Sequence, residues 1–156
     1  MSIDMLTGII IPLLPENYRK CHNIWDMDRQ PQRTKGWYDE LLSGNRIIFV
    51  YEEDGAYLGE VALVLDNGDP GYTIPGRRVY LSRMVVKESE RGRGIGGKLI
   101  DHAVSRAREM GFREMALGVD IVNVGARWLY EKKGFTSTIF VGEDSDGKYV
   151  KLLKKL

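Results

Sequence analysis

A glycine-rich loop between an apolar strand and a helix constrains this chain more than any other segment. Residues 79–86 are mostly apolar and β-branched, as in a buried strand, and a short charged turn leads from them into residues 91–97. Four of the six residues from Gly92 to Gly97 are glycine, which lets a backbone approach a ligand because no Cβ stands in the way. The N-terminus of the following helix adds unpaired N–H groups and the positive end of its dipole. The stretch therefore predicts an anion-binding loop, with pyrophosphate as the anion.

The overall composition limits the class of protein. With 156 residues the chain fits one domain, residues 1–156, with room for a sizeable core. Its 23 basic and 22 acidic residues nearly cancel, so neither nucleic acid nor a membrane is expected as a partner. The single cysteine, Cys21, excludes an internal disulfide and suits a reducing compartment. Because the start lacks the features of a signal peptide and the apolar residues 9–14 are too few to span a bilayer, we expect a soluble, cytoplasmic protein.

Turn signals and periodic segments alternate along the chain and predict a mixed α/β fold around one sheet. Gly44, Gly111 and Gly134 stand where three of the predicted helices end, and Asp54-Gly55 is a hairpin turn signal. The predicted strands cover residues 8–12, 46–51, 57–65, 79–86, 115–119, 136–141 and 148–153, and the predicted helices cover residues 15–27, 33–42, 96–110 and 123–133.

Two of three interpretations of the glycine-rich loop fit poorly. An ordinary strand-to-helix turn does not need this density of glycine. A dinucleotide fold is suggested by Gly92-x-Gly94-x-x-Gly97, and Asp120 lies where its ribose-binding acid belongs. However, the charged residues 87–91 separate the strand from the glycines, and the chain after Asp120 is too short to complete a doubly wound sheet.

The third interpretation takes the pattern Arg91-x-x-Gly94-x-Gly96 as the motif. With this pattern the sequence resembles the GNAT superfamily of N-acetyltransferases, although the proline that often stands at Glu88 in that family is absent. The resemblance is strong over residues 79–135 and includes two further family patterns, Met84-x-Val86 and Asn123-x-x-Ala126-x-x-x-Tyr130-Glu131-Lys132-Lys133-Gly134-Phe135.

The resemblance implies a GNAT-type fold, with a mostly antiparallel mixed sheet of about seven strands flanked by about four helices. It implies acetyl-CoA as co-substrate and no metal. Backbone N–H groups of the loop would bind the pyrophosphate, while the Arg93 and Lys98 side chains either reach phosphate oxygens or are solvated. The strand would pair with the pantetheine arm, which requires it to splay from residues 115–119. The implied cofactor-binding residues are Met84, Val85, Val86, Arg91, Gly92, Arg93, Gly94, Ile95, Gly96, Gly97 and Asn123, the last of which could equally be only a helix N-cap.

The implied reaction is direct transfer of acetyl from the thioester to a primary amine in a ternary complex. The Val86 N–H is the family's candidate donor to the oxyanion, and Tyr130 stands at the position of its general acid, with a core aromatic as the alternative role. A lysine-type amine has a pKa of about 10.4, so a base or a proton wire is useful. That base is left open between Tyr80, Ser82, Glu60 and water.

An acceptor pocket is expected between the first two helices and the sheet. Its aromatic and acidic side chains would suit a cationic amine, although such residues are also common in cores and on solvated helix faces. His22 and His102 lack metal-ligand spacing. The candidate pocket residues are Trp25, Asp26, Asp28, Trp37, Tyr38 and Asp39.

Two rivals to the acetyltransferase hypothesis remain at this point. One is a non-catalytic acyl-CoA-binding or regulatory module, and the other is a dinucleotide-binding oxidoreductase. The acceptor is left open between a small-molecule amine and a peptide amine, and association into a homodimer is left open as well.

Overall fold

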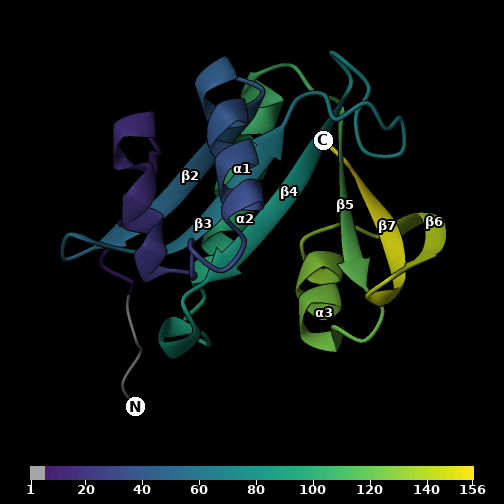
Figure 1. Ribbon diagram of the computed structural model, residues 1–156. Helices are drawn as coiled ribbons and strands as arrows, with labels where there is room; N and C mark the ends of the chain where they lie inside the picture. The colour runs from purple at the N-terminus through teal and green to yellow at the C-terminus, as the bar shows by residue number, and fades with distance from the viewer. Residues whose placement is uncertain (1–5) are drawn as a thin grey trace. The chain divides into compact units, whose positions relative to one another are not determined.

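The computed structural model describes residues 6–156, whose strands form a seven-stranded mixed sheet in the order β1-β2-β3-β4-β5-β7-β6 (Figure 1). The pair β4–β5 is parallel, whereas β1–β2, β5–β7 and β6–β7 are antiparallel. This confirms the mixed α/β fold expected from the sequence. The strands are β1 (Ile9–Pro12), β2 (Arg46–Glu53), β3 (Ala56–Val64), β4 (Arg78–Val86), β5 (Glu114–Asp120), β6 (Ser137–Asp144) and β7 (Gly147–Lys155), and the helices are η1 (Pro15–Asn23), α1 (Pro31–Ser43), η2 (Glu88–Glu90), α2 (Ile95–Glu109) and α3 (Val124–Lys132).

The chain divides into two compact units. The first unit comprises the chain up to Leu63 together with Arg83–Ala103, and the second comprises Val64–Ser82 with Val104–Leu156. The expectation of a single domain over residues 1–156 stays a prediction.

In the first unit, helices cover both faces of the strands. Ile48 and Val50 of β2 belong to a core cluster with residues of η1, whereas Phe49 points the other way and meets the His102 ring of α2 at 4.7 Å. This is the alternation expected of a strand that is buried on both faces. Gly59 of β3 allows the close approach of α2, because a Cβ there would lie 3.0 Å from the side chain of Leu99.

The core cluster of the first unit encloses the only cysteine of the chain. Cys21 is fully buried, and burial raises the pKa of its thiol well above the usual range. The side chain therefore behaves as a small apolar group. The cluster consists of Leu13, Tyr18, Cys21, Ile24, Met27, Ile48, Val50, Tyr57 and Ala62.

In the second unit, the turn-rich residues 66–76 are ordered by contacts with β7 and β5. Lys151 of β7 is buried, forms a 2.9 Å ion pair with Asp69, and lies 4.3 Å from the centre of the Tyr72 ring. The Tyr72 hydroxyl lies over Gly118 of β5, where any Cβ would collide with it. This loop carries no family pattern in the sequence, yet a buried charge and a glycine contact hold it in place.

The first predicted helix is shorter and more tightly wound than expected. It was predicted to run to about Met27, but it is a 3₁₀ helix that ends at Asn23. Side chains bind the backbone of the next turn, since His22 Nδ1 accepts the Met27 N–H at 3.2 Å and Asp26 Oδ1 accepts the Asp28 N–H at 3.0 Å. Such local bonds compete with helix continuation. Among the described residues, no helix combines the length and hydropathy needed to cross a bilayer.

Candidate functional site

The glycine loop, residues 91–97, begins after η2 and runs into the first turn of α2. Gly92 and Gly94 have φ angles of 83° and 91°, a left-handed conformation that other residues rarely adopt. A Cβ at either position would meet nothing within 4 Å, so the backbone angle and not packing requires glycine here. Gly96 and Gly97 lie in the first turn of α2, and Ile95, which is 1% exposed, anchors that turn in the core. The loop thus joins a helix N-terminus to two turns that only glycine adopts readily.

The two arginine side chains of this loop are occupied by protein groups. Arg93 forms a bidentate pair with Glu53, with both N–O distances at 3.0 Å, and a second pair with Glu90 at 2.8 Å. Arg91 Nε donates to the Val86 carbonyl at 3.1 Å. The Arg93 side chain, expected to reach phosphate oxygens or to be solvated, instead links the loop to β2. Its backbone N–H remains a candidate anion donor.

The direction of successive backbone N–H groups in β4 decides which of them could contact the pantetheine arm. Lys87 N–H donates to the Leu58 carbonyl of β3 at 2.8 Å. Because successive N–H groups of a strand point to opposite sides, the N–H groups of Met84 and Val86 point away from β3, while Val85 packs against the core cluster. Within the second unit, the register of β4 with β5 covers Arg78–Tyr80 and is not continued at Leu81 and Ser82.

Asn123 and Tyr130, the remaining predicted site residues, belong to the second unit. Asn123 is the N-cap of α3, and its side chain accepts the Ala126 N–H at 3.2 Å. Tyr130 is buried, with its ring edge-on to Phe135 at 6.0 Å between centres. Burial, with a smaller effect of Tyr80, raises the pKa of Tyr130 to about 12. The phenol is therefore protonated at neutral pH and able to donate a hydrogen bond.

The residues considered as base differ in their surroundings. Glu60 is fully buried in the first unit and accepts a hydrogen bond from Trp25 Nε1. Burial raises the pKa of its carboxyl, against the opposing effect of Arg83. Tyr80 stacks on Tyr72 in the second unit at 4.3 Å between ring centres. Glu60 is thus a buried side chain that is hydrogen-bonded to Trp25, and it is not exposed to solvent.

The first unit contains a cavity of about 230 Å³ beside η1, α1 and β4, here called the tryptophan cavity. Three of the six predicted pocket residues line it, namely Trp25, Asp26 and Trp37. Its arginines were not predicted from the sequence. The signal for Arg83 was present, because strand alternation places it on the same side as Val85, which packs against the core cluster, and a charged residue is unusual there. The charged and aromatic residues that line the cavity are Trp25, Asp26, Arg29, Arg33, Trp37 and Arg83.

Three of the predicted pocket residues do not line this cavity. Asp28 pairs with Arg19 at 3.2 Å, and Asp39 is exposed and pairs with Lys35 at 2.9 Å. Tyr38 lies with Asp28 around a separate hollow. Of the three acids expected in the acceptor pocket, Asp26 lines the tryptophan cavity and Asp28 and Asp39 do not.

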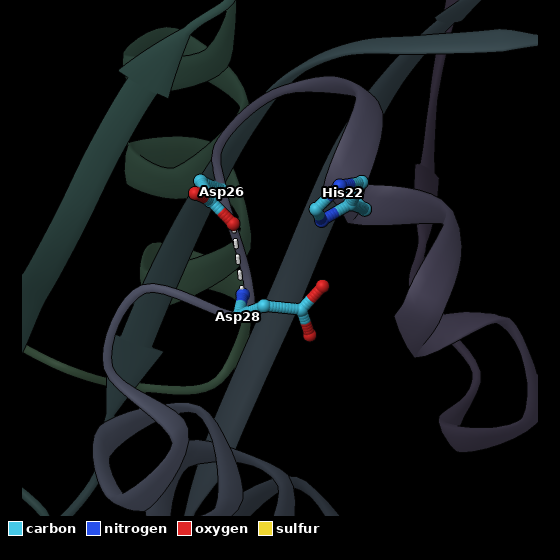
Figure 2. A group of neighbouring side chains, drawn as sticks. All are labelled: His22, Asp26 and Asp28. Atoms are coloured by element: carbon cyan, nitrogen blue, oxygen red, sulfur yellow. Dashed lines mark hydrogen bonds between the residues drawn. The ribbon is translucent and has the colours of Figure 1, made fainter.

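Figure 2 shows His22, Asp26 and Asp28 around the turn that follows η1. One potential metal-ligand atom of each lies within 4.8 Å of the others, and all three residues are exposed. Each already has a partner, namely the Met27 N–H, the Asp28 N–H and the Arg19 guanidinium. The cluster therefore stabilises the turn, a role that histidine spacing in the sequence did not indicate.

Comparisons with known proteins agree with this architecture. The N-alpha-acetyltransferase MAK3 of Arabidopsis thaliana is 32% identical over 90 residues, which are 58% of this chain and 45% of that protein. The chain spans about half the length, or less, of the first three curated relatives that it matches. Among solved structures, the ribosomal-protein-S18-alanine N-acetyltransferase of Escherichia coli superposes with a TM-score of 0.78 at 16% identity, covering 96% of this chain and 94% of that one.

A GNAT family acetyltransferase from Elizabethkingia anophelis, solved with acetyl-CoA bound, has a TM-score of 0.72 at 15% identity and covers 96% of this chain and 98% of that one. Likeness at these identities establishes the fold. The model of the acetyltransferase (GNAT) family matches residues 11–135, which include β4, the glycine loop and α3. Because that match covers most of its length, the chain belongs to the GNAT acetyltransferase family.

Proposed function

We propose that the protein transfers the acetyl group of acetyl-CoA to an amine by direct attack in a ternary complex. The observation that carries this proposal is the glycine loop, in which Gly92 and Gly94 adopt left-handed angles just before α2 begins. Backbone N–H groups at such a place attract phosphate groups. In this proposal residues 91–97 bind the pyrophosphate of acetyl-CoA.

The end of β4 supplies the next contacts in the proposal. The backbone groups of Met84 and Val86 that point away from β3 pair with the pantetheine arm. The Val86 N–H then donates to the oxygen that gains negative charge when the amine attacks the thioester carbonyl. This arrangement is supported by the direction of the Lys87 N–H, which donates to the Leu58 carbonyl of β3.

Tyr130 is assigned to the departing thiolate. Thiols have a pKa of about 8.5, so complete proton transfer from a phenol with a pKa of about 12 costs roughly 5 kcal/mol. A hydrogen bond from the neutral phenol stabilises the developing thiolate without that cost. We therefore assign Tyr130 as a hydrogen-bond donor in the transition state, with water able to complete the protonation.

The proposal is tested by calorimetry with acetyl-CoA and NAD, followed by single-turnover assays of thiol release over a panel of amines. We expect acetyl-CoA to bind, NAD not to bind comparably, and thiol release to depend on the amine. Binding without release for any amine would identify a non-catalytic acyl-CoA module. Preferential binding of NAD would identify the dinucleotide-binding alternative.

The Tyr130→Phe variant tests the assigned hydrogen bond, because it keeps the ring that packs against Phe135. We expect the single-turnover rate to fall about a hundredfold, the lower end of the range for general acids, with acetyl-CoA affinity and Tm unchanged. Tyr149→Phe, another tyrosine of the second unit, is the matched control. A wild-type single-turnover rate in Tyr130→Phe would show that the ring only packs.

A further inference from the structure

The tryptophan cavity has an arginine-rich lining whose positive charge the protein leaves largely uncompensated. Within residues 6–156, the guanidinium groups of Arg29, Arg33 and Arg83 make no ion pair and no hydrogen bond with a carboxylate. Among the described residues, the only acid in the lining is Asp26, and its Oδ1 already accepts the Asp28 N–H. Arginines that are not paired with protein carboxylates are available to a ligand.

The walls hold Arg83 in a fixed position. Its guanidinium lies 4.6 Å from the centre of the Trp25 ring and 4.8 Å from that of Trp37, and the two rings meet edge to face at 5.6 Å. Because the two indole planes are 77° apart, the guanidinium cannot lie parallel to both, but neither contact uses its hydrogen-bond donors. No hydrogen-bond partner of Arg83 Nε exists among the described residues. The group is therefore positioned by its contacts with the two rings and not by hydrogen bonds.

A second arginine beside Trp37 shows the contrast. Arg46 lies 5.2 Å from the Trp37 ring centre, is buried, and pairs with Glu40 at 3.6 Å. It does not line the cavity. The carboxyl of Glu60 interacts electrostatically with Arg83 without forming an ion pair, and Arg33 forms no ion pair with a carboxylate among residues 6–156. The arginine away from the cavity is thus paired, whereas those lining it are not.

We propose that the tryptophan cavity binds a carboxylate of the acceptor, so that the acceptor is a small compound bearing both an amine and a carboxylate. This inference rests on the proposed function and gives its acceptor a chemical class. Planar guanidinium groups bind carboxylates in a bidentate manner, and flanking indole rings suit an apolar body between the two functional groups. It replaces the cationic acceptor that the sequence had suggested.

Size and position agree with a small acceptor. A cavity of about 230 Å³ has the volume of roughly seven or eight liquid water molecules. Arg83 precedes Val86 by three residues on β4, which corresponds to roughly 10 Å along a strand. The cavity arginine and the proposed oxyanion donor therefore lie on the same strand of the first unit.

The test uses matched acceptors and measures binding separately from turnover. Calorimetry in the presence of CoA compares γ-aminobutyrate with n-butylamine and putrescine, and p-aminomethylbenzoate with benzylamine, and thiol release from acetyl-CoA is then measured with each. We expect the carboxylate member of each set to bind at least about tenfold more tightly and to be the better acceptor. Equal or better binding of the amines without a carboxylate, or no binding of either carboxylate compound at millimolar concentration, would overturn the proposal.

Variants connect this preference to the arginines. Arg33→Gln and Arg83→Met should each raise the Kd of the carboxylate compounds about tenfold to a hundredfold and leave acetyl-CoA affinity unchanged. Arg33 is exposed, so its variant keeps the test valid if Arg83→Met folds poorly. Arg108→Gln removes a positive charge from the exposed face of α2 and is the control. A carboxylate preference that survives in Arg33→Gln and in folded Arg83→Met would overturn the assignment to this cavity.

Two further outcomes separate this inference from the proposed function. Carboxylate binding that depends on the arginines, without thiol release, would support the cavity assignment and contradict the acetyltransferase activity. An acidic peptide that binds more tightly than both small carboxylates would overturn the small-acceptor class.

Discussion

The glycine loop and the tryptophan cavity both belong to the first unit, and they use their arginines in opposite ways. In the loop, Arg93 is bound by Glu53 and Glu90, so the groups left for an anion are backbone N–H groups. In the cavity, Arg33 and Arg83 have no carboxylate partner among residues 6–156, so the groups left for an anion are side chains. An arginine in a ligand-binding motif is therefore not evidence of a ligand contact until its partners are known.

The largest expected effect comes from a change in the loop backbone. Gly94→Asp places a side chain at a φ angle of 91° and adds negative charge where the proposed pyrophosphate binds. We expect acetyl-CoA affinity to fall at least about a hundredfold, which corresponds to roughly 3 kcal/mol, as measured by calorimetry on the folded variant. The control is Gly68→Asp, which makes the same substitution at a φ angle of 77° in the second unit. Similar affinities in both variants would remove the loop from the cofactor site.

A smaller effect is expected from replacing Arg93, which is paired with Glu53 and Glu90, and this effect is on stability. The hydrogen bonds from Arg93 are the main cause that lowers the pKa of Glu53 from 4.5 to about 2. The stabilisation from this pair is therefore complete above about pH 4.5 and is lost as the pH falls toward 2. We expect Arg93→Gln to lower the free energy of unfolding at pH 7 and to reduce its fall between pH 4.5 and 2, as measured by urea denaturation.

A double-mutant cycle distinguishes this structural pair from a phosphate contact. Glu53→Gln should destabilise the protein much as Arg93→Gln does, and the two changes together should cost less than their sum. If Arg93 instead bound phosphate, Glu53→Gln would leave stability nearly unchanged, and Arg93→Gln would act mainly on acetyl-CoA affinity.

The smallest effect is expected from an unpaired arginine of the cavity. Arg33 weakly opposes the charge of Arg83, so its removal relieves repulsion between like charges. We expect Arg33→Gln to change the free energy of unfolding by no more than about 0.5 kcal/mol. Any increase in the free energy of unfolding should be smaller in high salt, because salt screens the repulsion between exposed charges. A clear loss of stability measured by urea denaturation would show that Arg33 has a structural partner after all.

Local patterns in the sequence were sufficient for most of the fold. The left-handed glycines that follow α1 and α2, Gly44 and Gly111, were predicted as helix ends from the preference for glycine at that position. The Asp54-Gly55 turn has positive φ at both residues, as its sequence indicated. These features depend on neighbours in the chain and can therefore be read without the tertiary structure.

The candidate site was predictable only where it depends on the backbone. The loop was found from its glycines, but the partner of Arg93 is Glu53, forty residues earlier in the chain, and no local pattern indicates that pair. The arginine-rich lining of the cavity was not predicted for the same reason. Trp25 follows η1 and Trp37 belongs to α1, whereas Arg83 belongs to β4, and only tertiary contacts bring them together.

The buried position of Cys21 has a practical consequence for every measurement of thiol release. Thiol reagents attack the thiolate, and in the native protein the Cys21 thiol is both enclosed and held protonated. Folded protein should therefore react negligibly with such reagents, and the colour formed during turnover should come from CoA alone. Opening of the first unit would expose the Cys21 sulfur. The rate at which a thiol reagent labels Cys21 in the absence of substrate therefore measures local unfolding of the core that supports the tryptophan cavity.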